Sequence, residues 1–380
     1  MGTFGITRAA AGTFVFILVL ATALRCGGTS AAPSAGSGPA AKVTATAATP
    51  PAVAAAPTAP PRVPPAEPDR IRLSYGQSMA LAPFYLAIER GYLQEEGVMV
   101  DAEVQRGAGD VIAFLANGQL DVALGALGAG TFNAFAKGYD LRLVAPLAYY
   151  VPGDNTAPLV VRRDLIQNGA ATRVPDFRER RVATNSPGAI GEYLMGQYLT
   201  KGGLQLADVD VTYLPFPDVP VAMANAAIDA AVVPEPWTTT LRERELVEIA
   251  TSDMGRRTFG TGVLFGGKLL HERGDAGRRF IAAMLRATRD TQDRTQFLSP
   301  ANLETFSRWT QTGEDMLRRI SLNMFDPNLE IDLASIEHQR HFYAEQRRTT
   351  ALDPIPPDRM VDNSFVDYAL GRLGRVPARQ

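Results

Sequence analysis

The sequence predicts an α/β protein made of two similar lobes, and three observations support this prediction. Short apolar runs alternate with helix-like segments over most of the chain, which is the pattern of β-α-β units. A length of 380 residues exceeds what one hydrophobic core usually organises. The frame Ala-Asn-x-x-Leu/Ile-Asp-x-Ala occurs at Ala116–Ala123 and again at Ala224–Ala231, too far apart for a solenoid repeat. Asp121 and Asp229 occupy matching places in the frame, and a turn role is the favoured interpretation of both.

The first copy of this frame opens a stretch that predicts a ligand-facing turn. Asn117 and Gly118 end a helix, and Val122–Leu124 is a short apolar run typical of a strand covered on both faces. The small residues Gly125–Gly130 then lead into a predicted helix at Thr131–Lys137. A glycine-rich turn before a helix leaves backbone N–H groups uncovered, so it can hold an anion or a polar ligand edge.

The first lobe is predicted to be a parallel sheet with helices on both faces. Its elements in order are strand 71–75, helix 83–90, strand 97–104, a helix ending at 115, strand 122–124, helix 131–137 and strand 141–147. Ligands of such sheets bind beyond the carboxyl ends of the strands. The candidate turns are therefore Gln77–Pro83, Gly107–Asp110, Gly125–Gly130 and Tyr149–Pro152.

The second lobe is predicted to follow a crossing segment at Tyr149–Pro158. Its elements are strands 159–161, 181–184, 209–214 and 229–233 with helices 189–199 and 219–227, and strands 246–250 and 262–265 return the chain to the first lobe. Four further helices, at 276–291, 301–310, 314–321 and 333–346, are expected to wrap the first lobe.

Composition excludes several classes of function. The formal net charge of −2 and the absence of a basic block argue against nucleic acid as a partner. The chain has one cysteine and three histidines, so neither a disulfide nor a cysteine metal cluster can form, and histidine-based catalysis has little material. No cofactor and no metal are expected.

Residues 1–26 are predicted to be a targeting segment. Arg8 precedes an apolar run, Ala9–Ala23, that is too short for a comfortable membrane span and fits a secretory signal. Cys26 follows, as at a bacterial lipoprotein processing site, although Arg25 stands where that motif has a small residue. Lipid attachment at Cys26, cleavage nearby and an uncleaved membrane anchor all remain open.

Residues 27–68 are predicted to be a disordered tether. The segment consists of Ala, Pro, Gly, Ser and Thr with almost no charged or large apolar residues. Such a composition cannot bury enough surface to fold. A tether behind an export signal would hold the folded part close to a membrane.

Six motifs, spread from Ile71 to Gly374, carry a family resemblance. They are Pro83–Val98, Ala116–Ala123, Asn185–Leu194, Ala227–Trp237, Arg278–Ala287 and Val361–Gly374. Their order and spacing resemble the periplasmic-type substrate-binding proteins of ABC importers, in the branch serving nitrate, sulfonates, taurine and thiamine-pyrimidine precursors.

The resemblance implies a periplasmic-binding-protein-like type II fold, with a ligand cleft between two α/β lobes and C-terminal helices packed on the first. Lobe 1 would comprise residues 69–152 and 256–380, and lobe 2 residues 153–255. The protein would be an extracytoplasmic solute-binding component, periplasmic or on the cell surface. It would act as a monomer that delivers a small nutrient to an ABC permease with its ATPase.

The ligand contacts are expected on the turns at the strand ends. In the first lobe these are Ser78, Met79, Phe84, Ala108, Gly125, Leu127 and Tyr149, and in the second they are Asn185, Ser186, Ala189, Phe216, Glu235 and Trp237. Trp237 follows a rigid Pro-Glu-Pro stretch that can aim it into the cleft, with packing at the hinge as the alternative. Glu235 can accept hydrogen bonds from an amino-bearing ring or lie at the surface. Glu192, in the first turn of its helix, is expected to complement the helix dipole.

These candidates include aromatic rings and acids but no lysine or arginine. They favour an uncharged or amine-bearing heterocycle stacked on aromatic rings, such as a pyrimidine thiamine precursor. Backbone N–H groups at Gly125–Gly130 and Ser186–Ala189 can also bind an anion, so a sulfonate, taurine or nitrate is the alternative.

Other classes fit the sequence less well. A pyrimidine-synthesising enzyme of the same fold would need a cysteine-rich motif, a histidine donor and a lysine for pyridoxal phosphate, none of which falls in a matching turn. Gly125–Gly130 lacks the spacing of a dinucleotide site. His338 and His341 lie one helical turn apart, and solvated side chains are favoured over a metal site. A ligand-sensing module of a signalling protein is the surviving alternative, disfavoured because no kinase or membrane segment follows the lobes up to Gln380.

Overall fold

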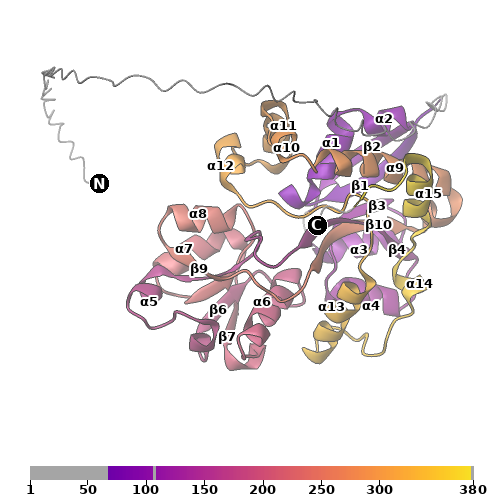
Figure 1. The fold of residues 1–380 in the computed structure, drawn as a ribbon. Helices are drawn as coiled ribbons and strands as arrows, with labels where there is room; N and C mark the ends of the chain where they lie inside the picture. The colour runs from indigo at the N-terminus through magenta and orange to yellow at the C-terminus, as the bar shows by residue number, and fades with distance from the viewer. Residues whose placement is uncertain (1–66, 106–107, 378–380) are drawn as a thin grey trace, which may run out of the picture. The chain divides into compact units, whose positions relative to one another are not determined.

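The computed structural model describes residues 67–105 and 108–377, and these belong to a single compact unit. Cys26 and nearly all of the predicted tether lie outside the described residues. Within the described ranges, the strands form two five-stranded sheets, each in its own lobe (Figure 1). No helix in these ranges is long and apolar enough to cross a membrane.

The sheet of the first lobe has the strand order β2-β1-β3-β10-β4. Its strands are β1 (Asp69–Tyr75), β2 (Val98–Val104), β3 (Val122–Ala126), β4 (Leu141–Tyr150) and β10 (Thr258–Gly266). β1 pairs in parallel with β2 and β3, but β10 lies antiparallel between β3 and β4. The expectation of a fully parallel sheet was therefore wrong. β4 leads out to the second lobe and β10 leads back from it, so the two adjacent strands must run in opposite directions.

The sheet of the second lobe has the order β7-β6-β8-β5-β9. Its strands are β5 (Leu159–Arg162), β6 (Arg181–Thr184), β7 (Asp210–Tyr213), β8 (Ala230–Val232) and β9 (Val247–Thr251). β6 pairs in parallel with β7 and β8, whereas β5 is antiparallel to β8 and β9. Each sheet therefore has a parallel half built from a strand flanked by two others, which is the plan that the repeated frame indicated.

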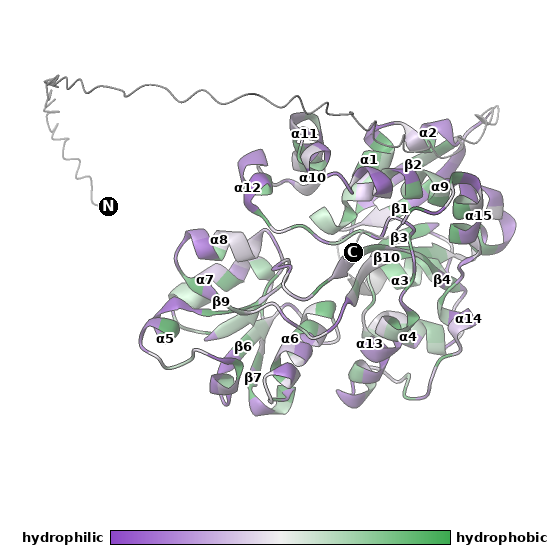
Figure 2. Cartoon of the chain, in the orientation of Figure 1, coloured by the Kyte–Doolittle hydropathy of each residue, from purple (hydrophilic) through white to green (hydrophobic). Residues whose placement is uncertain are grey.

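The predicted helices correspond to observed ones, with ends shifted by a few residues. The helices are α1 (Ala82–Glu89), α2 (Tyr92–Glu95), α3 (Ala108–Ala116), α4 (Ala129–Ala136), α5 (Arg163–Gln167), α6 (Ile190–Lys201), α7 (Val219–Ala224), α8 (Trp237–Glu243), α9 (Gly274–Asp290), α10 (Arg294–Phe297), α11 (Pro300–Thr310), α12 (Glu314–Arg319), α13 (Leu333–Glu345), α14 (Pro357–Met360) and α15 (Ser364–Leu373). The strands of the first sheet are mainly hydrophobic, whereas a short outer helix such as α12 is mainly hydrophilic (Figure 2).

The C-terminal helices pack on the first lobe, as expected. α9 contacts α1, α2 and α15, and α11 contacts α1, around the buried ring of Phe280. α13 contacts both α4 of the first lobe and α6 of the second. Its Tyr343 and Phe342 pack on Tyr193 of α6. Part of the C-terminal region therefore joins the two lobes.

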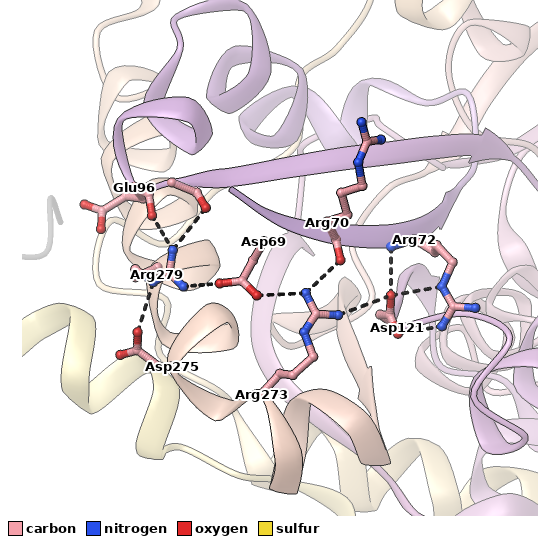
Figure 3. Close-up of polar contacts among 9 residues, drawn as sticks. Asp69, Arg70, Arg72, Glu96, Asp121, Arg273, Asp275 and Arg279 are labelled. Carbon is pink, nitrogen blue, oxygen red and sulfur yellow. Dashed lines mark hydrogen bonds and ion pairs between the residues drawn. The ribbon is translucent and has the colours of Figure 1, made fainter. Parts of the chain in front are cut away.

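Asp121 and Asp229 hold equivalent positions in the two sheets. The Asp121 carboxylate accepts the backbone N–H of Arg72 on β1 at 2.9 Å and the Arg72 guanidinium at 2.8 Å (Figure 3). Asp229 accepts the backbone N–H of Arg181 on β6 at 3.0 Å. Both aspartates are buried, at the amino ends of β3 and β8. They join neighbouring strands at the end of each sheet opposite the predicted ligand turns.

The first of these aspartates belongs to a larger ionic network (Figure 3). Arg273 pairs with Asp69 at 3.1 Å and donates to the carbonyl of Arg70 at 2.7 Å. The buried Arg279 of α9 also pairs with Asp69 and donates to the Glu96 carbonyl at 2.7 Å. The network therefore fastens α9 to the amino end of β1.

Replacing Asp121 with alanine should destabilise the fold. The change leaves the Arg72 N–H and guanidinium without their acceptor, and we expect a loss of about 3 kcal/mol in the free energy of unfolding, measured by urea denaturation. Asp101→Ala is the control, because Asp101 and its partner Arg70 are both exposed and should contribute under about 1 kcal/mol. Equal losses in the two variants would contradict a structural role for Asp121.

The contribution of Asp121 should also depend on pH. Burial opposes its ionisation, but the hydrogen bonds from Arg72 prevail and lower the pKa of the carboxyl below 3.8. A folded-state pKa below the unfolded one gives stability that is present above about pH 4 and lost as pH falls through the folded pKa. The stability difference between the wild type and Asp121→Asn should therefore be constant from about pH 7 to 5 and shrink below about pH 4. Denaturation curves across this range test it, and a difference that grows in acid would refute it.

Candidate ligand-binding site

A cavity of 540 Å³ lies between the lobes and is lined by both of them. The first lobe contributes α3, the end of β3, the start of α4 and one residue of β10, and the second lobe contributes the turn between β6 and α6. The lining residues are Gln105, Val111, Ile112, Ala113, Ala123, Leu124, Gly125, Ala126, Leu127, Gly128, Ala129, Gly130, Thr131, Tyr139, Asn185, Ser186, Pro187, Gly188, Ala189, Ile190 and Leu264.

The first-lobe wall follows from the glycine-rich turn after β3. Gly128 is extended and precedes α4 without a side chain that could cap the helix. The first turn of α4, Ala129–Thr131, lines the cavity, and the N–H groups of Ala129 and Thr131 donate to the carbonyls of Gly188 and Gly128. This places the positive end of the α4 dipole at the cavity wall.

The second-lobe wall is the turn Asn185–Ala189, between β6 and α6. Gly188 has φ of +70°, the left-handed conformation that glycine adopts without steric cost. The Asn185 carboxamide donates to the Ser186 hydroxyl and accepts from the Thr184 hydroxyl, both at 3.4 Å. Hydrogen bonds of this length are weak, so these polar groups can turn toward a ligand.

The two walls touch at a pair of glycines. The Ala129 N–H donates to the Gly188 carbonyl at 2.9 Å. A Cβ added to Gly188 would lie 2.9 Å from the Ala129 Cβ, and one added to Gly128 would lie 2.9 Å from the Gly188 oxygen. The absence of side chains at Gly128 and Gly188 therefore permits the lobes to approach this closely.

The described lining residues include no charged side chain. Apolar side chains from α3, β3 and β10 form much of the wall, and the polar side chains of the lining are those of Gln105, Thr131, Tyr139, Asn185 and Ser186. Arg106, which follows Gln105 in the sequence, lies outside the described residues. The arrangement suits a small molecule with an apolar body and a hydrogen-bonding edge.

Five of the predicted contacts line this cavity, namely Gly125, Leu127, Asn185, Ser186 and Ala189. A sixth predicted contact, Ala108, is the first residue of α3, but its side chain is not among those that the structure describes. These six positions lie at or beyond the carboxyl ends of β2, β3 and β6.

The other first-lobe candidates do not line the cavity. The Ser78 side chain accepts the N–H of Ala80 and so caps the 3₁₀ turn Met79–Leu81. The side chains of Met79 and Phe84 belong to the core of the first lobe. The Tyr149 ring is fully buried, and its hydroxyl accepts the N–H of Asp332 at 3.2 Å and donates to a neighbouring carbonyl.

The remaining second-lobe candidates are also engaged elsewhere. Glu235 accepts the N–H and hydroxyl of Thr239, at 3.0 and 2.9 Å, and the N–H of Ser321 at 3.1 Å. Burial raises the pKa of the Glu235 carboxyl, against these hydrogen bonds. Trp237 and Phe216 pack on the core of the second lobe. Tyr139 is the aromatic residue that the described lining provides.

Sequence reasoning missed several lining residues and one residue behind them. Val111 and Ile112 lie on α3, where helical periodicity alone does not separate core from cavity. Glu192, expected to complement the helix dipole, is fully buried and accepts hydrogen bonds from Gly188 and Arg348. His338, considered as a metal ligand, has its Nδ1 2.8 Å from the Tyr193 hydroxyl.

The chain is similar in sequence to a curated protein and in fold to several solved structures. A provisionally named binding protein of Brucella abortus is 26% identical over 210 residues, 52% of this chain. The match spans 59% of the length of that relative.

The solved structures share the fold at low sequence identity. The aliphatic sulphonate binding protein SsuA of Escherichia coli has a TM-score of 0.62 and 16% identity, covering 78% of this chain and 92% of its own. The nitrate-binding protein NrtA of Synechocystis PCC 6803 has a TM-score of 0.61 and 15% identity, covering 81% and 90%. The desulfurization enzyme DszB has a TM-score of 0.54 and 17% identity, and the match covers 80% of this chain and 99% of the DszB chain.

These matches confirm the predicted fold class, two α/β lobes of the periplasmic-binding-protein type, and the family resemblance that accompanied it. The model of the NMT1-like family matches residues 64–296, more than half of the sequence. The chain therefore belongs to the NMT1-like family.

Proposed function

We propose that the protein is the extracytoplasmic solute-binding component of an ABC importer. The observation that carries this proposal is the cavity lined by turns of both lobes, because a ligand held there contacts both and stabilises their closed arrangement. Membership in the NMT1-like family and the fold shared with SsuA and NrtA support the same role. The partner would be a membrane permease with its ATPase.

The proposed ligand is a small neutral heterocycle of the pyrimidine or thiamine-precursor kind. The uncharged, largely apolar lining supports it, and ring nitrogens can accept hydrogen bonds from the N-terminal turns of α4 and α6. The stacking on several aromatic rings expected from the sequence has little counterpart here, since Phe84, Tyr149, Phe216 and Trp237 line no part of this cavity. Shape and hydrogen bonding would therefore select the ligand.

An anion is the second candidate ligand. SsuA and NrtA are sulphonate- and nitrate-binding proteins, and two helix N-termini at one cavity favour negative charge. A sulfonate, taurine or nitrate would then rely on backbone N–H groups, with Arg106 as the nearest arginine in sequence to the lining residue Gln105.

A binding role is favoured over catalysis. DszB shows that an enzyme can share this fold. The described lining residues include no cysteine, histidine, lysine or carboxylate, so they offer no nucleophile paired with a base. The ligand-sensing module of a signalling system is a further alternative that the cavity alone does not separate from an importer component.

The N-terminal segment supports an exported location in this proposal. Residues 1–26 fit a secretory signal, Cys26 is the candidate for lipid attachment, and residues 27–68 would tether the lobes to the membrane. The folded part would then act as a monomer in the periplasm or on the cell surface.

Native mass spectrometry of the purified protein should reveal a co-purified neutral heterocycle, released on denaturation. The melting temperature should rise with a 4-aminopyrimidine and stay unchanged with taurine and nitrate, because the cavity offers hydrogen bonds without a compensating charge. If taurine or nitrate raises the melting temperature and Arg106→Gln abolishes that rise, the anion replaces the heterocycle as the proposed ligand. A protein that carries nothing and responds to none of the three would remove both ligand proposals.

Asn185 should contribute directly to binding of the compound that raises the melting temperature. Asn185→Ala removes polar groups that can turn toward the ligand, and we expect about tenfold weaker binding by isothermal titration calorimetry, equivalent to about 1.4 kcal/mol. Asn168→Ala is the matched control, because Asn168 lies exposed in a turn of the second lobe away from the cavity. Equal affinity in the wild type and both variants would exclude Asn185 as a contact.

A further inference from the structure

Glu192 is a fully buried carboxylate directly behind the ligand-facing turn. It lies in the first turn of α6 and accepts the Gly188 N–H at 2.7 Å and the Tyr213 hydroxyl. Arg348 donates to it from Nε at 3.0 Å and from a terminal nitrogen at 2.7 Å. A role at the amino end of α6 explains the contact of Glu192 with Gly188. It does not explain the contacts with Tyr213 and Arg348.

Arg348 comes from the other side of the cavity. It follows α13, and the next two residues are fixed to α4 of the first lobe. The Asn133 carboxamide oxygen accepts the Thr349 hydroxyl at 2.7 Å, the Thr350 N–H at 2.8 Å and the Thr350 hydroxyl at 2.9 Å. The Arg348 guanidinium is thereby anchored on the first lobe while it binds a carboxylate of the second.

These contacts form a closed ring across the lobes. α4 holds the Arg348 segment through Asn133, Arg348 binds Glu192, and Glu192 binds the Gly188 N–H. The Gly188 carbonyl then accepts the N–H of Ala129, the first residue of α4. The ring therefore starts and ends on the same helix and passes through the turn that lines the cavity.

The chemistry of the ring makes it sensitive to separation of the lobes. A guanidinium that donates two bonds to a buried carboxylate forms one of the stronger ionic contacts in proteins. The Arg348 side chain is 35% exposed and that of Glu192 is 0% exposed in the assembled lobes, so separation of the lobes removes the only cation that binds this carboxylate among the described residues. Without the cation, the position of the Glu192 carboxylate depends on the Tyr213 hydroxyl and the Gly188 N–H alone, so the Gly188 turn is held less firmly.

We propose that Glu192 and Arg348 are positioning residues that form a latch between the lobes, coupling lobe closure to the conformation of the ligand-facing turn Asn185–Ala189. The ligand role of that turn rests on the proposed function. Closure places Arg348 on Glu192, and Glu192 in turn fixes Gly188 so that its carbonyl meets α4. The Glu192 and Arg348 side chains themselves line no part of the cavity.

The latch can be tested without any ligand, in the full chain. Met99 of the first lobe and Val221 of the second are exposed and can be changed to cysteine for a spin-label pair, with Cys26→Ser to remove the native thiol. Double electron–electron resonance then gives the ratio of separated to closed lobes. We expect Arg348→Met and Glu192→Gln each to raise that ratio about tenfold over the wild type.

Arg372→Met is the matched control. Arg372 also binds a buried carboxylate through two bonds, at 2.8 and 3.0 Å to Glu96, but both residues lie in the first lobe. This variant should lose stability without changing the distance between the labels. Arg348→Lys, which retains the charge and loses the two-bond geometry, serves if Arg348→Met does not melt cooperatively.

Hydrogen exchange tests whether the latch also fixes the conformation of the Asn185–Ala189 turn or only holds the lobes together. In Arg348→Met, the amides of Gly188 and Ala129 should both exchange at least tenfold faster, whereas Arg372→Met should leave them unchanged. Faster exchange together with the longer distances supports the latch. Unchanged distances, or unchanged protection of Gly188, would overturn it, and neither outcome depends on whether the protein serves an importer.

Discussion

The lobes meet where Gly128 and Gly188 approach each other, and the cavity depends on that contact. The hydrogen bond from Ala129 to the Gly188 carbonyl places the turn after β3 against the turn after β6. A methyl group on either glycine would overlap the opposite turn. Since each turn leads into a helix, the contact also brings the positive ends of α4 and α6 to one space. The close approach of two backbones, more than any single side chain, therefore defines the candidate site.

The ion pairs that join neighbouring strands lie at the end of each sheet opposite the cavity. Asp121 with Arg72, and Asp229 with Arg181, join neighbouring strands at their amino ends. The ionic network at the amino end of β1 also binds α9 (Figure 3). The carboxyl ends carry glycine-rich turns and an uncharged cavity lining. Ionic contacts thus stabilise the sheets without competing for the ligand. The repetition of this arrangement explains why one sequence frame appears in both lobes.

The fold could be predicted largely from the sequence because its strands and helices have strong local signals. The order of the strands in a sheet has no such local signal. β10 was correctly assigned to the first lobe, but its antiparallel position depends on the path of the chain through the second lobe. Of the predicted contacts, Gly125 and Asn185 line the cavity, and both were proposed from the position of the backbone alone. Phe84 and Tyr149 were proposed in the same way, but their rings are buried in the core and do not line this cavity. A place near the end of a strand does not fix the direction of a side chain.

Glu192 is a second case in which the sequence did not indicate what the side chain contacts. In the sequence it is an acid in the first turn of a helix, a position that the helix dipole alone explains. Its cationic partner, Arg348, lies far along the chain. Arg348 reaches Glu192 because α13 packs on both α4 and α6. A helix cap and an interlobe contact are therefore indistinguishable until the lobes are placed together. In the closed arrangement one carboxylate serves both, and this shared use is what can transmit closure to the turn that faces the cavity.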